Sequence, residues 1–154
     1  MRKKGTPLIR AKKTEYKGKN FQSRLEVYMF KKLDDNGIPC KYEEERFTII
    51  EPFYFENASY EKTINSKNNL INKGGKKHLG IIYTPDFIVE NGSQRIIIEC
   101  KGLATDVFSM RFKLFKKWIA DNKKDYVLFT PRNQGQCDFV FEEVKKLLNA
   151  KTNT

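Results

Sequence analysis

The chain has 154 residues and a mass of 18.1 kDa, the size of one domain. It carries 30 Lys and Arg against 19 Asp and Glu, a net charge of +11, and 13% of its residues are aromatic, which excludes disorder of the whole chain. Its apolar runs are too short for a membrane span or a signal peptide. Three cysteines without a CxxC pair argue against a zinc site and a disulfide framework, so we expect a cytoplasmic protein with no membrane partner.

The first half of the chain predicts an arm, a helix, two strands and an insertion. Residues 1–19 lack apolar periodicity and are strongly basic, which predicts a flexible basic arm. From Phe21, apolar residues recur every fourth position, which predicts a helix that ends near Gly37. Strands are predicted over 38–44 and 46–50. Residues 52–80, rich in Asn, Lys and Gly, predict an insertion or long loop.

The second half predicts a hairpin followed by alternating helix and strand. Two β-rich runs, 81–90 and 94–100, flank the turn dipeptide Asn91-Gly92. A helix is predicted over 105–122, a strand over 126–130, and a last helix capped by Asp138. We therefore expect a single α/β domain over residues 20–150, with a mixed central sheet flanked by helices and a tail at 151–154.

The positive charge is concentrated in the arm, in residues 62–78 and in residues 111–124. Clustered cations gain affinity for a polyanion by releasing its counterions, so the distribution favours nucleic acid as the partner. A solvated face or a membrane-surface patch is the alternative. The candidate DNA-binding residues are Lys3, Lys4, Arg10, Lys12, Lys13, Lys17, Lys19, Arg111 and Lys113.

Two carboxylates and an ammonium converge at one end of the predicted hairpin. Asp86 follows Pro85 on one arm, and alternation places Glu99 and Lys101 on one face of the other. Asp86, Glu99 and the backbone carbonyl of Cys100 offer the hard oxygen ligands that Mg²⁺ prefers, and Mn²⁺ can substitute. Lys101 can hold an attacking water or offset charge on the phosphate.

Each of these residues also has a purely structural explanation. Asp86 can be a turn residue after proline, and Glu99 with Lys101 can be an exposed ion pair. Ser23 and Glu26 have the spacing of a capping box, in which Glu26 would only satisfy a backbone donor.

The segments Pro85-Asp86 and Glu99-Cys100-Lys101 match the defining motif of the PD-(D/E)xK nuclease superfamily, which this chain resembles. Over residues 20–104 it further resembles the phage endonuclease I family of Holliday-junction resolvases, on the segments 21–26, 36–38, 42–44, 83–87 and 99–103. The resemblance implies a restriction-endonuclease-like αβββαβ core. It also implies that Glu26 joins the metal site and that the active species is a homodimer.

The function implied is metal-dependent endonucleolytic cleavage of branched DNA, leaving 5′-phosphate ends. The catalytic residues would be Glu26, Asp86, Glu99 and Lys101, in a phage-encoded protein of the host cytoplasm. Two alternatives stay open: a non-catalytic basic nucleic-acid-binding protein, and a nicking or single-strand nuclease on the same core. A non-catalytic nucleic-acid-binding protein would have no need of the acidic residues beside Lys101, whereas either kind of nuclease would use them.

Overall fold

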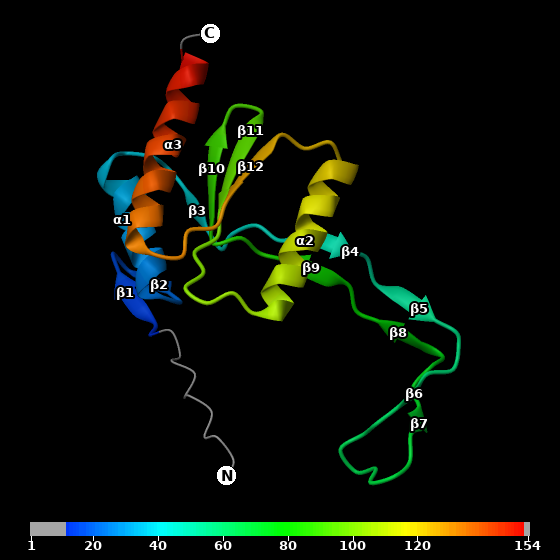
Figure 1. The fold of residues 1–154 in the computed structure, drawn as a ribbon. Helices are drawn as coiled ribbons and strands as arrows, with labels where there is room; N and C mark the ends of the chain where they lie inside the picture. Colours follow the sequence, from blue (N-terminus) through cyan, green and yellow to red (C-terminus); the bar gives the residue numbers. More distant parts are fainter. Residues whose placement is uncertain (1–11, 153–154) are drawn as a thin grey trace.

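The computed structural model describes residues 12–152 (Figure 1). It opens with a hairpin of β1 (Thr14–Tyr16) and β2 (Lys19–Phe21). Its turn residues, Lys17 and Gly18, both have positive φ, at 49° and 73°, as a tight two-residue turn requires. The prediction of a flexible arm is therefore wrong for residues 14–19, while most of residues 1–13 lie outside the described part.

Helix α1 (Arg24–Asp35) begins at the N-cap Ser23. The Ser23 hydroxyl accepts a hydrogen bond from the Glu26 amide, which satisfies one free donor of the first turn. Its apolar face buries Val27, Met29, Phe30 and Leu33. The helix starts three residues later than the periodicity predicts, because Phe21 packs into the core from a strand.

The central sheet has the strand order β12-β11-β10-β3 and is mixed, as predicted. Strands β10 (Phe87–Asn91) and β11 (Gln94–Ile98) form the predicted antiparallel hairpin. Strand β3 (Lys41–Tyr42) adds antiparallel to β10. Strand β12 (Tyr126–Phe129) runs parallel to β11, and helix α2 (Asp106–Asp121) makes the crossover between them.

Helices cover both faces of this sheet (Figure 1). Helices α1 and α3 (Gln134–Thr152) pack on the face that carries Phe87, Val89, Ile96 and Ile98. Phe115 of α2 packs on the other face, against Ile88 and Ile97. Alternation along the buried hairpin thus sends side chains into two separate cores, and the predicted α/β class is confirmed.

Asp138 does not cap the last helix, so that prediction is wrong. Helix α3 begins at Gln134, and Asp138 lies within its second turn. The carboxylate accepts a hydrogen bond from the Tyr28 hydroxyl at 2.8 Å and pairs with Lys32 at 2.8 Å, both on α1. Asp138 therefore joins the two helices, a contact between distant segments that local sequence cannot indicate.

The predicted strand 81–90 is broken at Pro85. Strand β9 (Ile81–Tyr83) pairs with β4 (Phe47–Ile50) in a separate two-stranded sheet, whereas Phe87 onwards belongs to β10. Pro85 has no backbone N–H to donate, which explains the break between the two strands. The chain consequently changes sheets at the residue that precedes Asp86.

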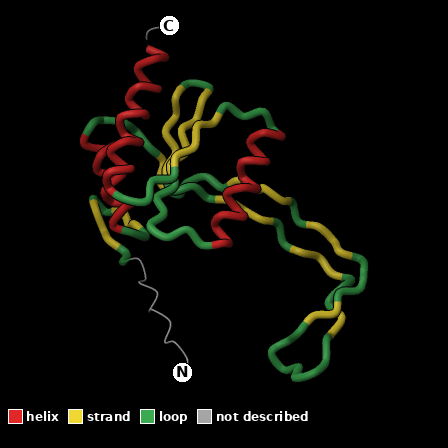
Figure 2. The backbone as a smooth tube through the Cα atoms, viewed as in Figure 1, coloured by secondary structure: helices red, strands yellow, loops and turns green. Residues whose placement is uncertain are grey.

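Residues 52–80 are not a structureless loop. Strand β5 (Phe53–Phe55) pairs with β8 (Lys76–His78), and β6 (Tyr60–Glu61) pairs with β7 (Ile71–Asn72). These pairs continue outward from β4 and β9 as a two-stranded extension that projects from the rest of the molecule (Figure 2). We call residues 51–80 the ribbon.

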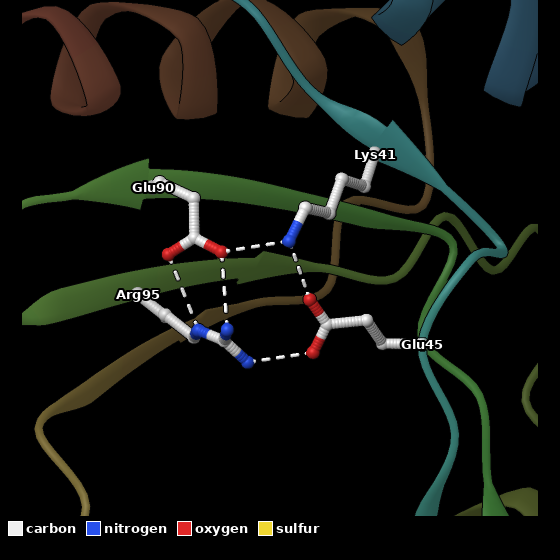
Figure 3. Close-up of polar contacts among 4 residues, drawn as sticks. All are labelled: Lys41, Glu45, Glu90 and Arg95. Carbon is white, nitrogen blue, oxygen red and sulfur yellow. Dashed lines mark hydrogen bonds and ion pairs between the residues drawn. The ribbon is translucent and has the colours of Figure 1, made fainter.

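With the β1–β2 hairpin, the β4–β9 pair and the ribbon set aside, the elements follow the order α1, β3, β10, β11, α2, β12, α3. Four charged side chains join the outer part of the sheet to the segment after β3: Glu45 lies between Lys41 and Arg95, and Glu90 contacts the same two cations (Figure 3).

None of the three helices found in residues 12–152 has the length and apolar character that a membrane span requires.

Candidate active site

Asp86 and Glu99 lie across from each other at one end of the β10–β11 hairpin. Phe87 pairs with Ile98 in the strand register, so Asp86 and Glu99 are the next residues along the two arms of the hairpin. Both are buried, with exposed fractions of 7% and 4%. The Cys100 amide donates a hydrogen bond of 2.6 Å to Asp86 Oδ2, which closes the end of the hairpin.

Glu99 is held between a tyrosine and a lysine. The Tyr83 hydroxyl, from the end of β9, donates to Glu99 Oε2 at 2.9 Å. Lys101 Nζ lies 3.3 Å from Glu99 Oε1, which places both side chains on one face as alternation predicts. The Lys101 side chain stays 39% exposed and its ammonium lies over the Phe108 ring. The ammonium thus remains accessible to a ligand while Glu99 is buried.

Glu26 lies at the start of α1 and is 5% exposed. Its carboxylate accepts hydrogen bonds from the Tyr42 hydroxyl at 2.6 Å, from the Gln22 amide at 3.0 Å and from the Ser23 hydroxyl at 2.8 Å. Tyr42 belongs to β3, the neighbour of β10, so this contact brings the α1 glutamate to the Asp86 edge. The capping interaction with Ser23 forms as well, as the spacing of the two residues predicts.

The three carboxylates influence one another electrostatically. Burial, followed by the charges of Glu99 and Glu26, raises the pKa of Asp86 to about 8. Burial also raises the pKa of Glu99, against the opposing effects of Lys101 and Tyr83. Raised carboxyl pKa values in one place are typical of a functional site, because a core would not gather charges that repel one another.

Glu43, which lies in the resemblance segment 42–44 but is not among the predicted site residues, is a fourth acidic residue near this edge. Its amide donates to the Asp86 carbonyl at 2.9 Å, and its backbone takes a positive φ of 49°. Burial and then the charges of Glu26 and Glu99 raise the pKa of Glu43, whereas Lys101 and Lys13 lower it. Only the β3–β10 register brings Glu43 here, so no spacing along the chain could have identified it.

The donor set fits a hard divalent cation by its chemistry. Three buried carboxylates gather near the Lys101 ammonium, and oxygen ligands of this kind are those that Mg²⁺ prefers. Over residues 12–152, however, no group of three or more His, Cys, Asp or Glu side chains is arranged to hold a metal ion. In this arrangement each of the three carboxylates is hydrogen-bonded to protein donors.

A comparison with known families matches residues 8–135 to the family described as "Protein of unknown function (DUF1064)". The chain belongs to this family. The matched part of the DUF1064 chain contains Glu26, Asp86, Glu99 and Lys101. No curated protein and no solved structure matches the chain.

The predicted DNA-binding residues of this DUF1064 protein are spread over several surfaces. Arg111 and Lys113 are exposed on α2, and Lys12 and Lys13 are exposed just before β1. Lys17 forms an ion pair with Asp34 at 2.5 Å, and Lys19 lies over the Phe30 ring. The predicted residues Lys3, Lys4 and Arg10 lie outside the described part of the chain.

Proposed function

We propose that this protein is a metal-dependent endonuclease that hydrolyses DNA phosphodiester bonds, with Glu26, Asp86, Glu99 and Lys101 as its catalytic residues. The observation that carries the proposal is the meeting of buried Asp86 and Glu99 with the accessible ammonium of Lys101 at the end of one hairpin. A protein that only neutralises phosphates gains nothing from buried carboxylates, which repel a polyanion.

The order of the elements supports a restriction-endonuclease-like core. From α1 through β3, β10, β11 and α2 to β12, the chain follows the αβββαβ order of the PD-(D/E)xK nucleases, with the β4–β9 pair and the ribbon inserted after β3. The motif residues flank β10 and β11. A match of motif and element order is a stronger argument than the short motif alone.

Asp86, Glu99, Glu26 and the Cys100 carbonyl would hold Mg²⁺, or Mn²⁺ in its place. Such an ion polarises a phosphate oxygen and lowers the pKa of a bound water. The Tyr83 hydroxyl and Lys101 orient the Glu99 carboxylate, and the Cys100 amide orients that of Asp86. The Lys101 ammonium would donate a hydrogen bond to the attacking water, or would stabilise the negative charge that develops on the phosphate.

The proposed substrate is branched DNA of the four-way junction type, and the proposed active species is a homodimer. Resolving a junction requires two cuts in opposed strands, whereas residues 12–152 of each chain offer one cluster of this kind. A two-fold symmetric dimer would supply the second site with matching symmetry.

The test is cleavage of four-way junction, duplex, nicked and single-stranded DNA, assayed in parallel with Mg²⁺. We expect the junction to be cut fastest, and Asp86→Asn or Glu99→Gln to lower the rate roughly a hundredfold or more. Glu142→Gln, which neutralises a surface carboxylate on α3, is the matched control and should cleave like the wild type. DNA binding with no cleavage of any substrate would favour the non-catalytic alternative, and cleavage of single strands or one strand only would favour the nicking or single-strand nuclease.

A further inference from the structure

The ribbon has a defined shape although it has no core of its own. A Cβ atom on Gly74 would lie 1.8 Å from the Asn57 carbonyl oxygen, so only glycine permits this close approach of the two sides of the ribbon. The Asn72 side chain accepts hydrogen bonds from the Ser59 and Gly74 amides, both at 3.0 Å. The Tyr54 hydroxyl donates to the Gly75 carbonyl at 2.6 Å. These contacts give the ribbon a specific conformation.

The surface of the ribbon combines aromatic rings with lysines. Phe53, Tyr54 and Tyr60 are 50%, 60% and 65% exposed. Between residues 62 and 78 the sequence has five lysines and no acidic residue. Lys76 and Lys77, opposite the aromatic strand β5, are exposed and form no ion pair with the described residues. Free cations beside exposed rings suit a nucleic acid, which offers both phosphates and base faces.

The ribbon is connected directly to the candidate active site. Strand β8 leads through Leu79 and Gly80 into β9, whose last residue, Tyr83, binds Glu99. Six extended residues, the separation of Lys77 from Tyr83, span about 20 Å. One turn of duplex DNA rises about 34 Å, and its major groove admits a two-stranded β-ribbon. Lys76 and Lys77 therefore lie within about one helical turn of a phosphate held at the candidate active site.

We propose that the ribbon is a DNA-binding arm that contacts the duplex flanking the phosphate at the active site. The inference rests on the proposed nuclease function and adds where the enzyme holds its substrate. A second copy of the chain is a less favourable occupant. In a symmetric contact between two ribbons, both copies would bring the same unpaired Lys76 and Lys77 to one interface, and like charges repel.

The test compares two double variants that remove the same charge. Lys76→Ala/Lys77→Ala changes the ribbon, and Lys145→Ala/Lys146→Ala changes α3, which lies on the opposite side of the molecule from the ribbon (Figure 1). Binding to a fluorescent duplex of about 30 base pairs, roughly three helical turns, is followed by anisotropy in EDTA over a range of KCl concentrations. Because no divalent ion is present, the measurement reports binding and not cleavage.

We expect the ribbon variant to bind roughly tenfold or more weakly than the wild type near 0.1 M salt, and its plot of log K against log [salt] to be shallower by about two. The α3 variant should retain wild-type affinity and slope. Equal losses of affinity in both variants, or none in the ribbon variant, would overturn the proposal. So would light scattering that shows the ribbon variant losing an oligomeric state while keeping its affinity for DNA. If the nuclease proposal fails, the wild type cleaves no DNA in the Mg²⁺ assay. That result is distinct from a failure of the ribbon proposal, which is measured by binding in EDTA.

Discussion

Asp86 Oδ2 accepts a hydrogen bond of 2.6 Å from the backbone amide of Cys100. The two residues are 14 positions apart and meet because β10 and β11 pair in register up to Phe87 and Ile98. An amide can donate to a carboxylate or to the carbonyl oxygen of a neutral carboxyl, so this bond orients Asp86 in both protonation states. Burial and the neighbouring carboxylates then determine which state prevails.

Asp86 should make the metal-free protein less stable as the pH rises. Its pKa is about 8 in the folded state and near 3.8 in the unfolded chain, so the folded state binds the proton more tightly. The contribution of the Asp86 proton to the free energy of unfolding is complete below about pH 4. It decreases as the pH rises from about 4 to about 8, by at most about 1.4 kcal/mol per pH unit. Thermal unfolding in EDTA should show Asp86→Asn melting above the wild type at pH 8 and level with it at pH 4.

The control for this experiment is Asp138→Asn, for which the opposite sign is expected. Hydrogen bonds from Lys32 and Tyr28 lower the pKa of Asp138, so its carboxylate stabilises the fold at neutral pH and ceases to do so in acid. An Asp86→Asn variant that melts below the wild type at pH 8 would show that Asp86 is charged at little cost in the native protein.

Phe115 of α2 packs against Tyr83, the residue that donates a hydrogen bond to Glu99. Its ring is fully buried and stacks on that of Tyr83 at a centroid distance of 4.3 Å. We expect Phe115→Ala to lower the free energy of unfolding by about 3–5 kcal/mol, because a cavity opens in the α2 core. Urea unfolding measures the decrease. Phe139→Ala, at a 61% exposed position on α3, should stay within about 0.5 kcal/mol of the wild type.

Glu45 and Arg95 should be coupled in stability. Arg95 Nη1 lies 2.6 Å from Glu45 Oε2, and both side chains are about three-quarters buried, with 27% and 26% exposed (Figure 3). A double-mutant cycle of Glu45→Gln and Arg95→Gln should give a coupling energy of about 1 kcal/mol, which decreases at high salt. Hydrogen bonds from Lys41 and Arg95 lower the pKa of Glu45, so the coupling should vanish as the pH falls below that carboxyl's ordinary range. A coupling that persists in acid would contradict an ionic interaction.

The N-terminal basic segment should contribute to DNA affinity and not to stability. Deleting residues 1–11 removes Arg2, Lys3, Lys4 and Arg10 but leaves the β1–β2 hairpin and the buried Phe21. We expect an unchanged melting temperature and a shallower salt dependence of duplex binding, by up to about 0.9 for each phosphate that the segment neutralises. Deleting residues 1–19 should also destabilise the protein, because Tyr16 of β1 packs against Phe30. An unchanged salt slope after the shorter deletion would exclude phosphate binding by these four residues.

Local signals were sufficient where neighbours in the sequence are neighbours in space. The hairpin around Asn91-Gly92 was predictable because its turn and its alternating strands lie within one segment, and it carries Asp86, Glu99 and Lys101 to one end. The ribbon was not predictable, because strands of two or three residues are too short to show a periodicity, and the Asn- and Gly-rich stretches between them indicate a loop. Their pairing depends on contacts such as that of Gly74 with Asn57.

By itself the sequence determined the α/β class, the basic character of the chain and the carboxylates with the lysine at the end of the hairpin, because composition and short-range periodicity encode them. Only the tertiary structure decided that Glu26 reaches this edge through Tyr42, that Glu43 lies beside it and that Tyr83 orients Glu99. These contacts join α1, β3, β9 and the hairpin, and they depend on the register and packing of elements far apart in the chain.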